Sequence, residues 1–126
     1  LYLKVSDIFP NNSFPKVQND ASIKNVIVEI SAKRLGITMV MDAVNNMLGV
    51  ITDGDIRRML DKHDDLKGLV AEDIMNRTPI SIDLDEYAIN ALNYMQDKNI
   101  TQLIVMENSK PVGVVHLHDL LKEGLV

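Results

Sequence analysis

The stretch GVITDGDIRRML, residues 49–60, joins a strand pattern directly to a helical one. Its first part is apolar and β-branched, which predicts a buried strand, and its charged second part is typical of a surface helix. Thr52 ends the strand pattern and Asp55 opens the helical one, with the turn-forming pair Asp53 and Gly54 between them. The stretch is therefore either a turn with a capped helix, or such a junction that also holds a ligand.

A second copy of this pattern, GVVHLHDLLKEG, occupies residues 113–124. The repeat extends further, because VSDIF at 5–9 resembles AEDIM at 71–75, and the copies align at an offset of about 64 to 66 positions. Each copy contains an amphipathic helix pattern with apolar residues at Ile23, Val26, Ile27 and Ile30, or at Ala88, Ala91, Leu92 and Met95. The apolar runs at 37–42 and 102–107 predict buried strands.

Composition limits the classes of function. The chain has 126 residues, 46% of them hydrophobic and 25% charged, which indicates an ordinary globular protein. The net charge of −5 argues against a binder of nucleic acid or anionic membranes. No cysteine, spanning segment or signal-peptide pattern is present, so we expect a cytoplasmic protein without disulfides. The chain does not begin with methionine, and we expect it to be part of a longer protein.

The repeat predicts an α+β fold made of two pseudo-symmetric units, each with the order β-α-β-β-α and packed together through their small sheets. One unit of about sixty residues buries too little surface to be stable alone, so two units are expected to share a core. The predicted domains are residues 1–66 and 67–126.

The paired endings GVITDGD and GVVHLHD resemble those of cystathionine-β-synthase-type (CBS) domains, and the chain is similar to a tandem pair of them, a Bateman module. The stretches LGITMVMD, GVITDGDIRR, NITQLIVME and GVVHLHDLL also resemble the C-terminal part of bacterial arabinose-5-phosphate isomerases, which serve the pathway to Kdo, the acidic sugar of lipopolysaccharide. Nothing in the chain resembles their N-terminal sugar-isomerase domain. The resemblance implies an allosteric regulatory module, not an enzyme in itself, that forms a homodimer and acts on an attached or cognate isomerase domain.

Thr52 and Asp55 have the chemistry of a nucleotide site. A threonine hydroxyl at a helix N-terminus can donate to phosphate, and an ionised aspartate accepts hydrogen bonds from ribose hydroxyls. The alternative is a plain helix cap, worth about 1 kcal/mol without any ligand. The resemblance implies nucleotide contacts for Thr52, Asp55 and Asp119. Arg58 is favoured over Arg57 as a partner of phosphate or carboxylate because it lies one turn from Gly54.

The second copy carries a histidine where the first has threonine. His116 can also donate to phosphate, and His118 lies just before Asp119. A metal bound by these three residues is an alternative, but no further ligand is evident and no metal is expected. The complete predicted ligand-binding set is Thr52, Asp53, Asp55, Arg58, His116, His118 and Asp119. Thr78, Pro79 and Ile80 are added to it if they lie near the end of the ligand cleft where the base of a nucleotide would bind. The alternative is that these three residues serve only as a rigid entry into the second unit.

The expected effector is CMP-Kdo or a related nucleotide, with no cofactor. Two alternatives remain open: an adenine-nucleotide sensor of the AMP type, and a purely structural dimerisation module without an effector. Catalysis through His116, His118 and Asp119 is not expected, because no nucleophile and base are paired.

Overall fold

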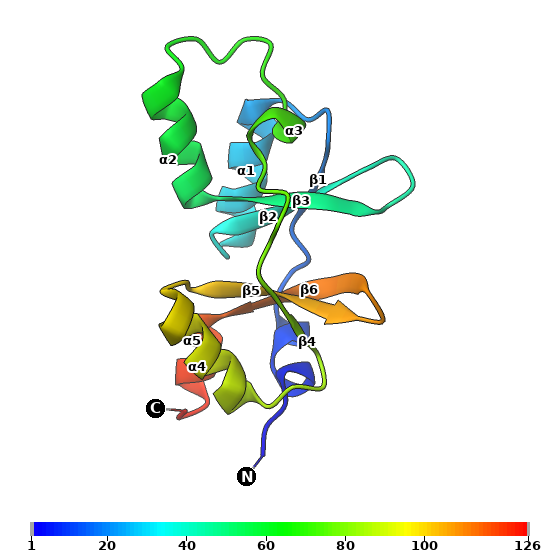
Figure 1. The fold of residues 1–126 in the computed structure, drawn as a ribbon, viewed down its shortest axis with the longest axis vertical. Coiled ribbons are helices and arrows are strands. Elements are labelled where there is room, and N and C mark those ends of the chain that lie inside the picture. The colour runs from blue at the N-terminus through cyan, green and yellow to red at the C-terminus, as the bar shows by residue number, and fades with distance from the viewer. Residues whose placement is uncertain (1, 126) are drawn as a thin grey trace. The chain divides into compact units, whose positions relative to one another are not determined.

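The computed structural model describes residues 2–125, which form two compact units (Figure 1). The β1–β3 unit is Pro15–Pro79, and the β4–β6 unit joins the segment that ends at Phe14 to the chain from Ile80 onward. These units differ from the sequence repeats 1–66 and 67–126, because each unit contains the leading segment of the other repeat. Backbone pairing explains the exchange: the amide of Val5 donates to Glu86, and the amide of Ala71 donates to Ala21.

The β1–β3 unit has the predicted order of strands and helices. It contains β1 (Lys16–Gln18), α1 (Ile23–Lys33), β2 (Ile37–Met41), β3 (Met47–Thr52), α2 (Asp53–Lys62) and the short α3 (Ala71–Ile74). The sheet order is β1-β2-β3, with β1 parallel and β3 antiparallel to β2, and Val40 pairs with Val17 on one side and Gly49 on the other. In Figure 1, α1 and α2 lie on the same face of this sheet.

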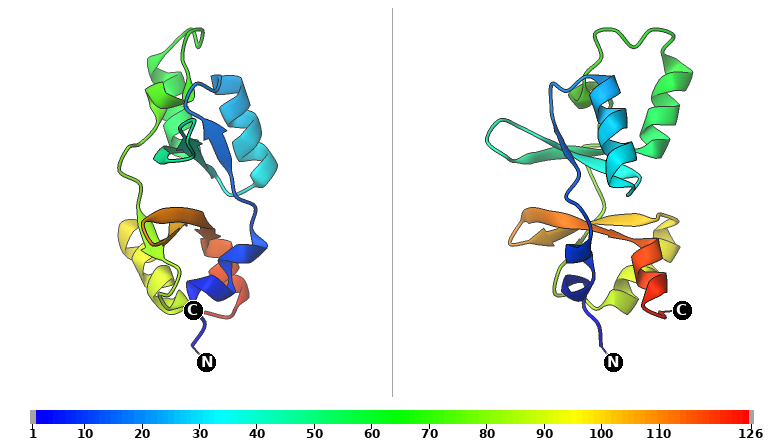
Figure 2. Two further views of the ribbon diagram at one scale, coloured as in Figure 1. Left: turned by 90° about the vertical axis from the view of Figure 1, so that its right-hand side faces the viewer. Right: turned by 180° about the vertical axis from the view of Figure 1, so that it is seen from behind.

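The β4–β6 unit repeats this arrangement. It contains η1 (Val5–Asp7), η2 (Phe9–Asn11), β4 (Ser81–Asp83), α4 (Ala88–Lys98), β5 (Gln102–Glu107), β6 (Lys110–His116) and α5 (Leu117–Lys122). The sheet order is β4-β5-β6, again with one parallel and one antiparallel pair. Figure 2 shows the amino-terminal segment (blue) beside this sheet and α5. The mixed α+β fold expected from the sequence is confirmed.

Each unit buries its own apolar cluster, and the clusters use the helix faces that the periodicity predicted. In the β1–β3 unit, Val26 and Ile30 pack with Val40, Ile51 and Ala71. In the β4–β6 unit the cluster comprises Val5, Ile8, Ala88, Ala91, Leu92, Met95, Leu103, Val105, Val115 and Leu120. One predicted core position differs, because Ile27 remains 38% exposed although its repeat equivalent, Leu92, is 1% exposed.

Two glycines of the repeated motif let another segment cross the sheet closely. A Cβ at Gly49 would lie 2.5 Å from the backbone oxygen of Asn76, and a Cβ at Gly113 would lie 2.5 Å from the ring of Phe9. Asn76 exchanges both backbone hydrogen bonds with Val50, at 2.7 and 2.9 Å. The two glycines therefore let the crossing segments approach the sheet three residues before Thr52 and three residues before His116, the last residues of β3 and β6.

Among residues 2–125, no helix has the length and apolar character needed to cross a membrane.

Candidate functional site

The junction between β3 and α2 is closed by reciprocal hydrogen bonds between Thr52 and Asp55. The Thr52 hydroxyl accepts from the Asp55 amide at 3.2 Å and donates to Asp55 Oδ2 at 3.1 Å, and the Thr52 amide donates to the same oxygen at 2.9 Å. This arrangement is a capping box. Asp55 was expected to open the helix, but α2 begins two residues earlier, at Asp53, because the Thr52 hydroxyl provides the cap.

Arg58 occupies the other oxygen of the same carboxylate. Its Nη2 lies 2.6 Å from Asp55 Oδ1, and the side chain of Arg58 is 65% exposed whereas that of Asp55 is 16% exposed. A Cβ at Gly54 would lie 3.3 Å from the guanidinium nitrogens, so the guanidinium covers this glycine. Because each carboxylate oxygen offers two acceptor positions, Oδ1 can accept one more hydrogen bond.

A pocket of about 240 Å³ opens beside this ion pair, within the β1–β3 unit. Arg58 and Lys62 contribute cations to its wall, and Asp73 of α3 faces it. The full lining is Asp55, Arg58, Met59, Lys62, His63, Asp73 and Ile74. Asp53 lies outside this lining and is exposed, while its amide donates to the Gly36 carbonyl. The pocket gives a ligand space next to the exposed side of Asp55 and Arg58.

The junction between β6 and α5 repeats the arrangement with a histidine cap. The His116 amide donates to Asp119 Oδ2 at 2.9 Å, as the Thr52 amide does to Asp55. His116 Nδ1 accepts from the His118 amide at 3.1 Å, so the ring proton lies on Nε2. As in the first junction, the aspartate lies inside the first helical turn and the residue before the helix caps it.

Asn12 is a polar partner of this junction that the sequence analysis did not identify. Its Nδ2 donates to Asp119 Oδ2 at 2.7 Å and to the Val114 carbonyl at 2.9 Å. The offset of 66 that relates 5–9 to 71–75 also relates Asn12 to Thr78, but this correspondence does not show that Asn12 reaches Asp119. Asn12 therefore holds Asp119 from a segment more than a hundred residues away in the chain.

The surroundings of His116 favour its neutral form. Burial lowers the pKa of His116 below its usual value, and the neighbouring His118, whose ring centroid lies 4.7 Å away, lowers it further, while Asp119 acts in the opposite direction. Neutral His116 can accept at Nδ1 and present Nε2–H as a donor. Among residues 2–125, no three histidine, aspartate or glutamate side chains are arranged to hold a metal ion.

Thr78, Pro79 and Ile80 fall at the boundary between the two units. Thr78 belongs to the β1–β3 unit, where its amide and hydroxyl both donate to Asn76 Oδ1, at 3.0 and 3.1 Å. Ile80 belongs to the β4–β6 unit, where its carbonyl accepts from Ile104 and its side chain packs on the core. Pro79 is the last residue of the β1–β3 unit.

Both repeats match the family model of the CBS domain, over residues 5–62 and 70–125, and the chain belongs to this family. It is 39% identical to arabinose 5-phosphate isomerase KdsD of Yersinia pestis and 36% identical to KdsD of Escherichia coli K12. Both alignments cover the entire chain but only 39% of the relative. The chain thus spans about two fifths of the length of these curated relatives.

Solved structures agree with the fold. The CBS domain NE2398 has a TM-score of 0.87 and 20% identity, with full coverage of both chains. The CBS domain protein PAE2072 from Pyrobaculum aerophilum, solved in complex with AMP, has a TM-score of 0.80 and 25% identity, and the match covers 96% of this chain and 97% of that one.

Proposed function

We propose that the chain is the regulatory, nucleotide-binding CBS pair of a longer arabinose 5-phosphate isomerase. The proposal is supported by 39% identity along the whole chain to KdsD of Yersinia pestis, of which the chain spans 39%. The attached sugar-isomerase domain would carry the reaction, and the CBS pair would control its rate allosterically, in the pathway to lipopolysaccharide.

The observation that carries the proposal is the aspartate held at the same place in both strand–helix junctions. Asp55 Oδ1 retains an acceptor position, which suits a ribose hydroxyl. Arg58 is largely exposed and can leave Asp55 for an anionic ligand at little cost, because exposed ion pairs contribute only about 0–1 kcal/mol. A nucleotide would thus place its ribose at Asp55 and its phosphate toward Arg58.

The hydrogen bonds of Thr52 support a positioning role for this residue rather than a direct contact with phosphate. Its single hydroxyl proton is already donated to Asp55, so the hydroxyl is not available to a phosphate unless the capping box opens. Thr52 therefore acts by fixing the carboxylate of Asp55. Arg58 and Lys62, which line the adjoining pocket, are the better donors to an anion.

The second junction is proposed to make different contacts. His116 presents Nε2–H, and Asp119 is already held by Asn12 and the His116 amide, so this junction offers one neutral donor and one positioned carboxylate. We propose that this junction, taken by itself, favours a different chemical group from the one favoured at Asp55. Asp53, His118, Thr78, Pro79 and Ile80 complete the proposed ligand-binding set.

The proposed effector is CMP-Kdo, which combines a ribose diol, a phosphodiester and a carboxylate. These groups match in kind an aspartate acceptor, an arginine and a neutral histidine donor. As the activated end product of the pathway, CMP-Kdo would give feedback control. AMP is the alternative, supported by the AMP complex of PAE2072 at 25% identity.

The proposal is tested by calorimetric titration of CMP-Kdo, CMP, AMP and ATP into the chain. Wild-type protein is expected to bind CMP-Kdo or AMP, and Asp55→Asn, which keeps a cap acceptor but loses the charge, is expected to weaken binding at least about tenfold. Asp61→Ala, an exposed acid later on α2, is the matched control and leaves affinity unchanged. Absence of binding by all four nucleotides at millimolar concentration would contradict the proposal.

A purely structural module without an effector is the competing function. It predicts that Asp55→Asn changes neither the activity nor the regulation of the full-length isomerase. A nucleotide response of the full-length enzyme that disappears in Asp55→Asn, with unchanged basal activity, excludes this alternative.

A further inference from the structure

The amino-terminal segment at residues 3–12 (the arm) ends at the carboxylate of the second strand–helix junction. Near its start the arm is anchored in the apolar cluster of the β4–β6 unit, where Val5 is 0% and Ile8 is 3% exposed. At its end the arm is anchored by Asn12, whose Nδ2 lies 2.7 Å from Asp119 Oδ2. The arm therefore links the core of this unit to the aspartate of the junction.

Hydrogen-bonded turns connect the two anchors of the arm. The Ile8 amide donates to the Val5 carbonyl at 3.0 Å, and the Asn12 amide donates to the Phe9 carbonyl at 2.9 Å. The Phe9 ring packs closely over Gly113 of β6. The arm is thus a packed piece of the unit along its length, and a change at Asn12 can reach its core anchor through contiguous contacts.

The side-chain amide of Asn12 can make its contacts in one orientation. Its two partners, the Asp119 carboxylate and the Val114 carbonyl, are both acceptors, so the amide presents its NH₂ group and uses both donor hydrogens. Asp119 Oδ2 also accepts from the His116 amide at 2.9 Å. Because both contacts reach Oδ2, they fix the carboxylate while leaving Oδ1 as the oxygen that Asp119 can offer to a ligand hydroxyl.

The first junction holds its aspartate in another way. Thr78 corresponds to Asn12 at the offset of 66, but its hydroxyl and its amide both donate to Asn76 Oδ1. Asp55 pairs instead with Arg58 of its own helix. The contact between a leading segment and the aspartate is therefore a property of the second junction.

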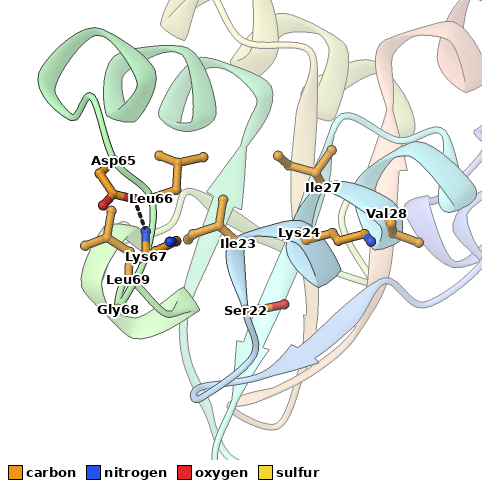
Figure 3. A pocket seen from close by; sticks show the side chains of 10 residues that line it. All are labelled: Ser22, Ile23, Lys24, Ile27, Val28, Asp65, Leu66, Lys67, Gly68 and Leu69. Atoms are coloured by element: carbon orange, nitrogen blue, oxygen red, sulfur yellow. Dashed lines mark hydrogen bonds between the residues drawn. The ribbon is translucent and has the colours of Figure 1, made fainter.

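The start of the arm is also seated differently from its counterpart in the β1–β3 unit. Leu3 packs against the apolar cluster of the β4–β6 unit. Leu69, its counterpart at the same offset, lines an apolar pocket of about 500 Å³ between α1 and the loop at 65–69 (Figure 3). The arm is thus packed at its start and hydrogen-bonded to the junction at its end, as a coupling element requires.

We propose that Asn12 positions Asp119 for the effector and couples occupancy of Asp119 to the docking of the arm. A ligand hydroxyl bound at Oδ1 stabilises the carboxylate conformer that Asn12 holds, so it also stabilises the docked arm. By linkage, the docked arm raises the affinity of the site by the same factor. This inference rests on the proposed function, in which the arm continues to the sugar-isomerase domain, and it adds the route by which that domain senses the effector.

Amide hydrogen exchange of the full 126-residue chain, with and without CMP-Kdo or AMP, tests the coupling. At saturation with a nucleotide that binds, exchange of the amides at residues 8–12 is expected to slow at least about fivefold. Asn12→Ala should lose this slowing and bind the nucleotide at least about fivefold more weakly. Asn11→Ala, at the exposed neighbouring position of the arm, is the matched control and should behave like wild type. Circular dichroism checks that each variant is folded.

Three results of this experiment would overturn the coupling. The first is saturation of the wild-type chain with no change in exchange of the arm. The second is an Asn12→Ala chain that binds the nucleotide as tightly as wild type. The third is tighter binding by Asn12→Ala, because Asn12 would then compete with the ligand for Asp119 instead of positioning it.

A comparison without nucleotide separates this proposal from the proposed function. Asn12→Ala and Asp119→Ala should each speed exchange of the arm at least about threefold, the effect of losing one hydrogen bond. The double substitution should be no faster than the faster single one, because both remove the same contact. Asp55→Ala, at the equivalent position of the other unit, is the control and should leave exchange of the arm unchanged.

The two proposals fail in different ways. Non-additive effects of Asn12→Ala and Asp119→Ala support the coupling whether or not a nucleotide binds, and additive effects overturn it. Absence of binding by every nucleotide tested contradicts the proposed function, whereas binding without protection of the arm contradicts only the coupling.

Discussion

The hydroxyl of Thr52 and the carboxylate of Asp55 hold each other in place: Oγ1 donates to Oδ2 at 3.1 Å and accepts from the Asp55 amide at 3.2 Å. The hydroxyl thereby satisfies an otherwise unpaired amide of the first helical turn, and it also fixes the rotamer of the aspartate. The same pair consequently stabilises α2 and positions the proposed ribose acceptor.

Thr52→Val is expected to lower the free energy of unfolding by about 1 kcal/mol, because it keeps the shape of the side chain but removes the cap acceptor. Urea unfolding followed by circular dichroism measures the change. Thr52→Ser retains the hydroxyl and is the control, with stability close to that of wild type. Equal stability of the valine and wild-type chains would show that the capping box does not contribute to folding.

Asn12→Ala is expected to destabilise the β4–β6 unit by about 1–2 kcal/mol. The substitution removes the donor to both Asp119 and the Val114 carbonyl, which leaves partly buried acceptors without that partner. Thermal unfolding measures the loss. Asn11→Ala, at the exposed neighbouring position, is the control, and a loss of the same size there would contradict a specific role for Asn12.

Gly49→Ala and Gly113→Ala are expected to differ in cost. At Gly49 the new methyl group would meet the backbone oxygen of Asn76, whose segment is fixed by two hydrogen bonds to Val50. At Gly113 it would meet the Phe9 ring, a side chain that can rotate away. We expect about 2–3 kcal/mol of destabilisation at Gly49 and a smaller loss at Gly113, measured by urea unfolding of both variants. A larger loss at Gly113 would contradict this reading of the crossing segments.

Much of the fold could be predicted because the repeat and the apolar periodicity are local properties of the sequence. The exchange of leading segments could not, since similarity between 5–9 and 71–75 shows what each segment resembles and not which sheet it joins. Ile27 shows a related limit: periodicity identified its helix face, but burial depends on whether neighbouring segments cover that face, and here they leave it 38% exposed.

The candidate site was predictable to a similar extent. The positions of Thr52, Asp55 and Arg58 follow from their spacing across one helical turn, and the structure brings the three side chains together. The spacing did not show that Thr52 would use its only hydroxyl proton on Asp55. Asn12 was missed because it reaches Asp119 through the tertiary fold, and local spacing carries no information on such a contact.

The histidine cap of α5 makes a prediction about pH that the threonine cap of α2 does not share. The folded state lowers the pKa of His116, through burial and His118, against its ordinary value of 6.5. The unfolded chain therefore binds the proton first as the pH falls. The stability contributed by neutral His116 is fully present above about pH 6.5 and is lost as the pH falls below it, when protonated Nδ1 can no longer accept from the His118 amide. Amide hydrogen exchange in the first turn of α5 between pH 7.5 and 5, corrected for intrinsic rates, should show this loss of protection. His116→Thr, which copies Thr52, should remove the pH dependence that arises from the cap, and persistence of the full effect in that variant would assign it to another group.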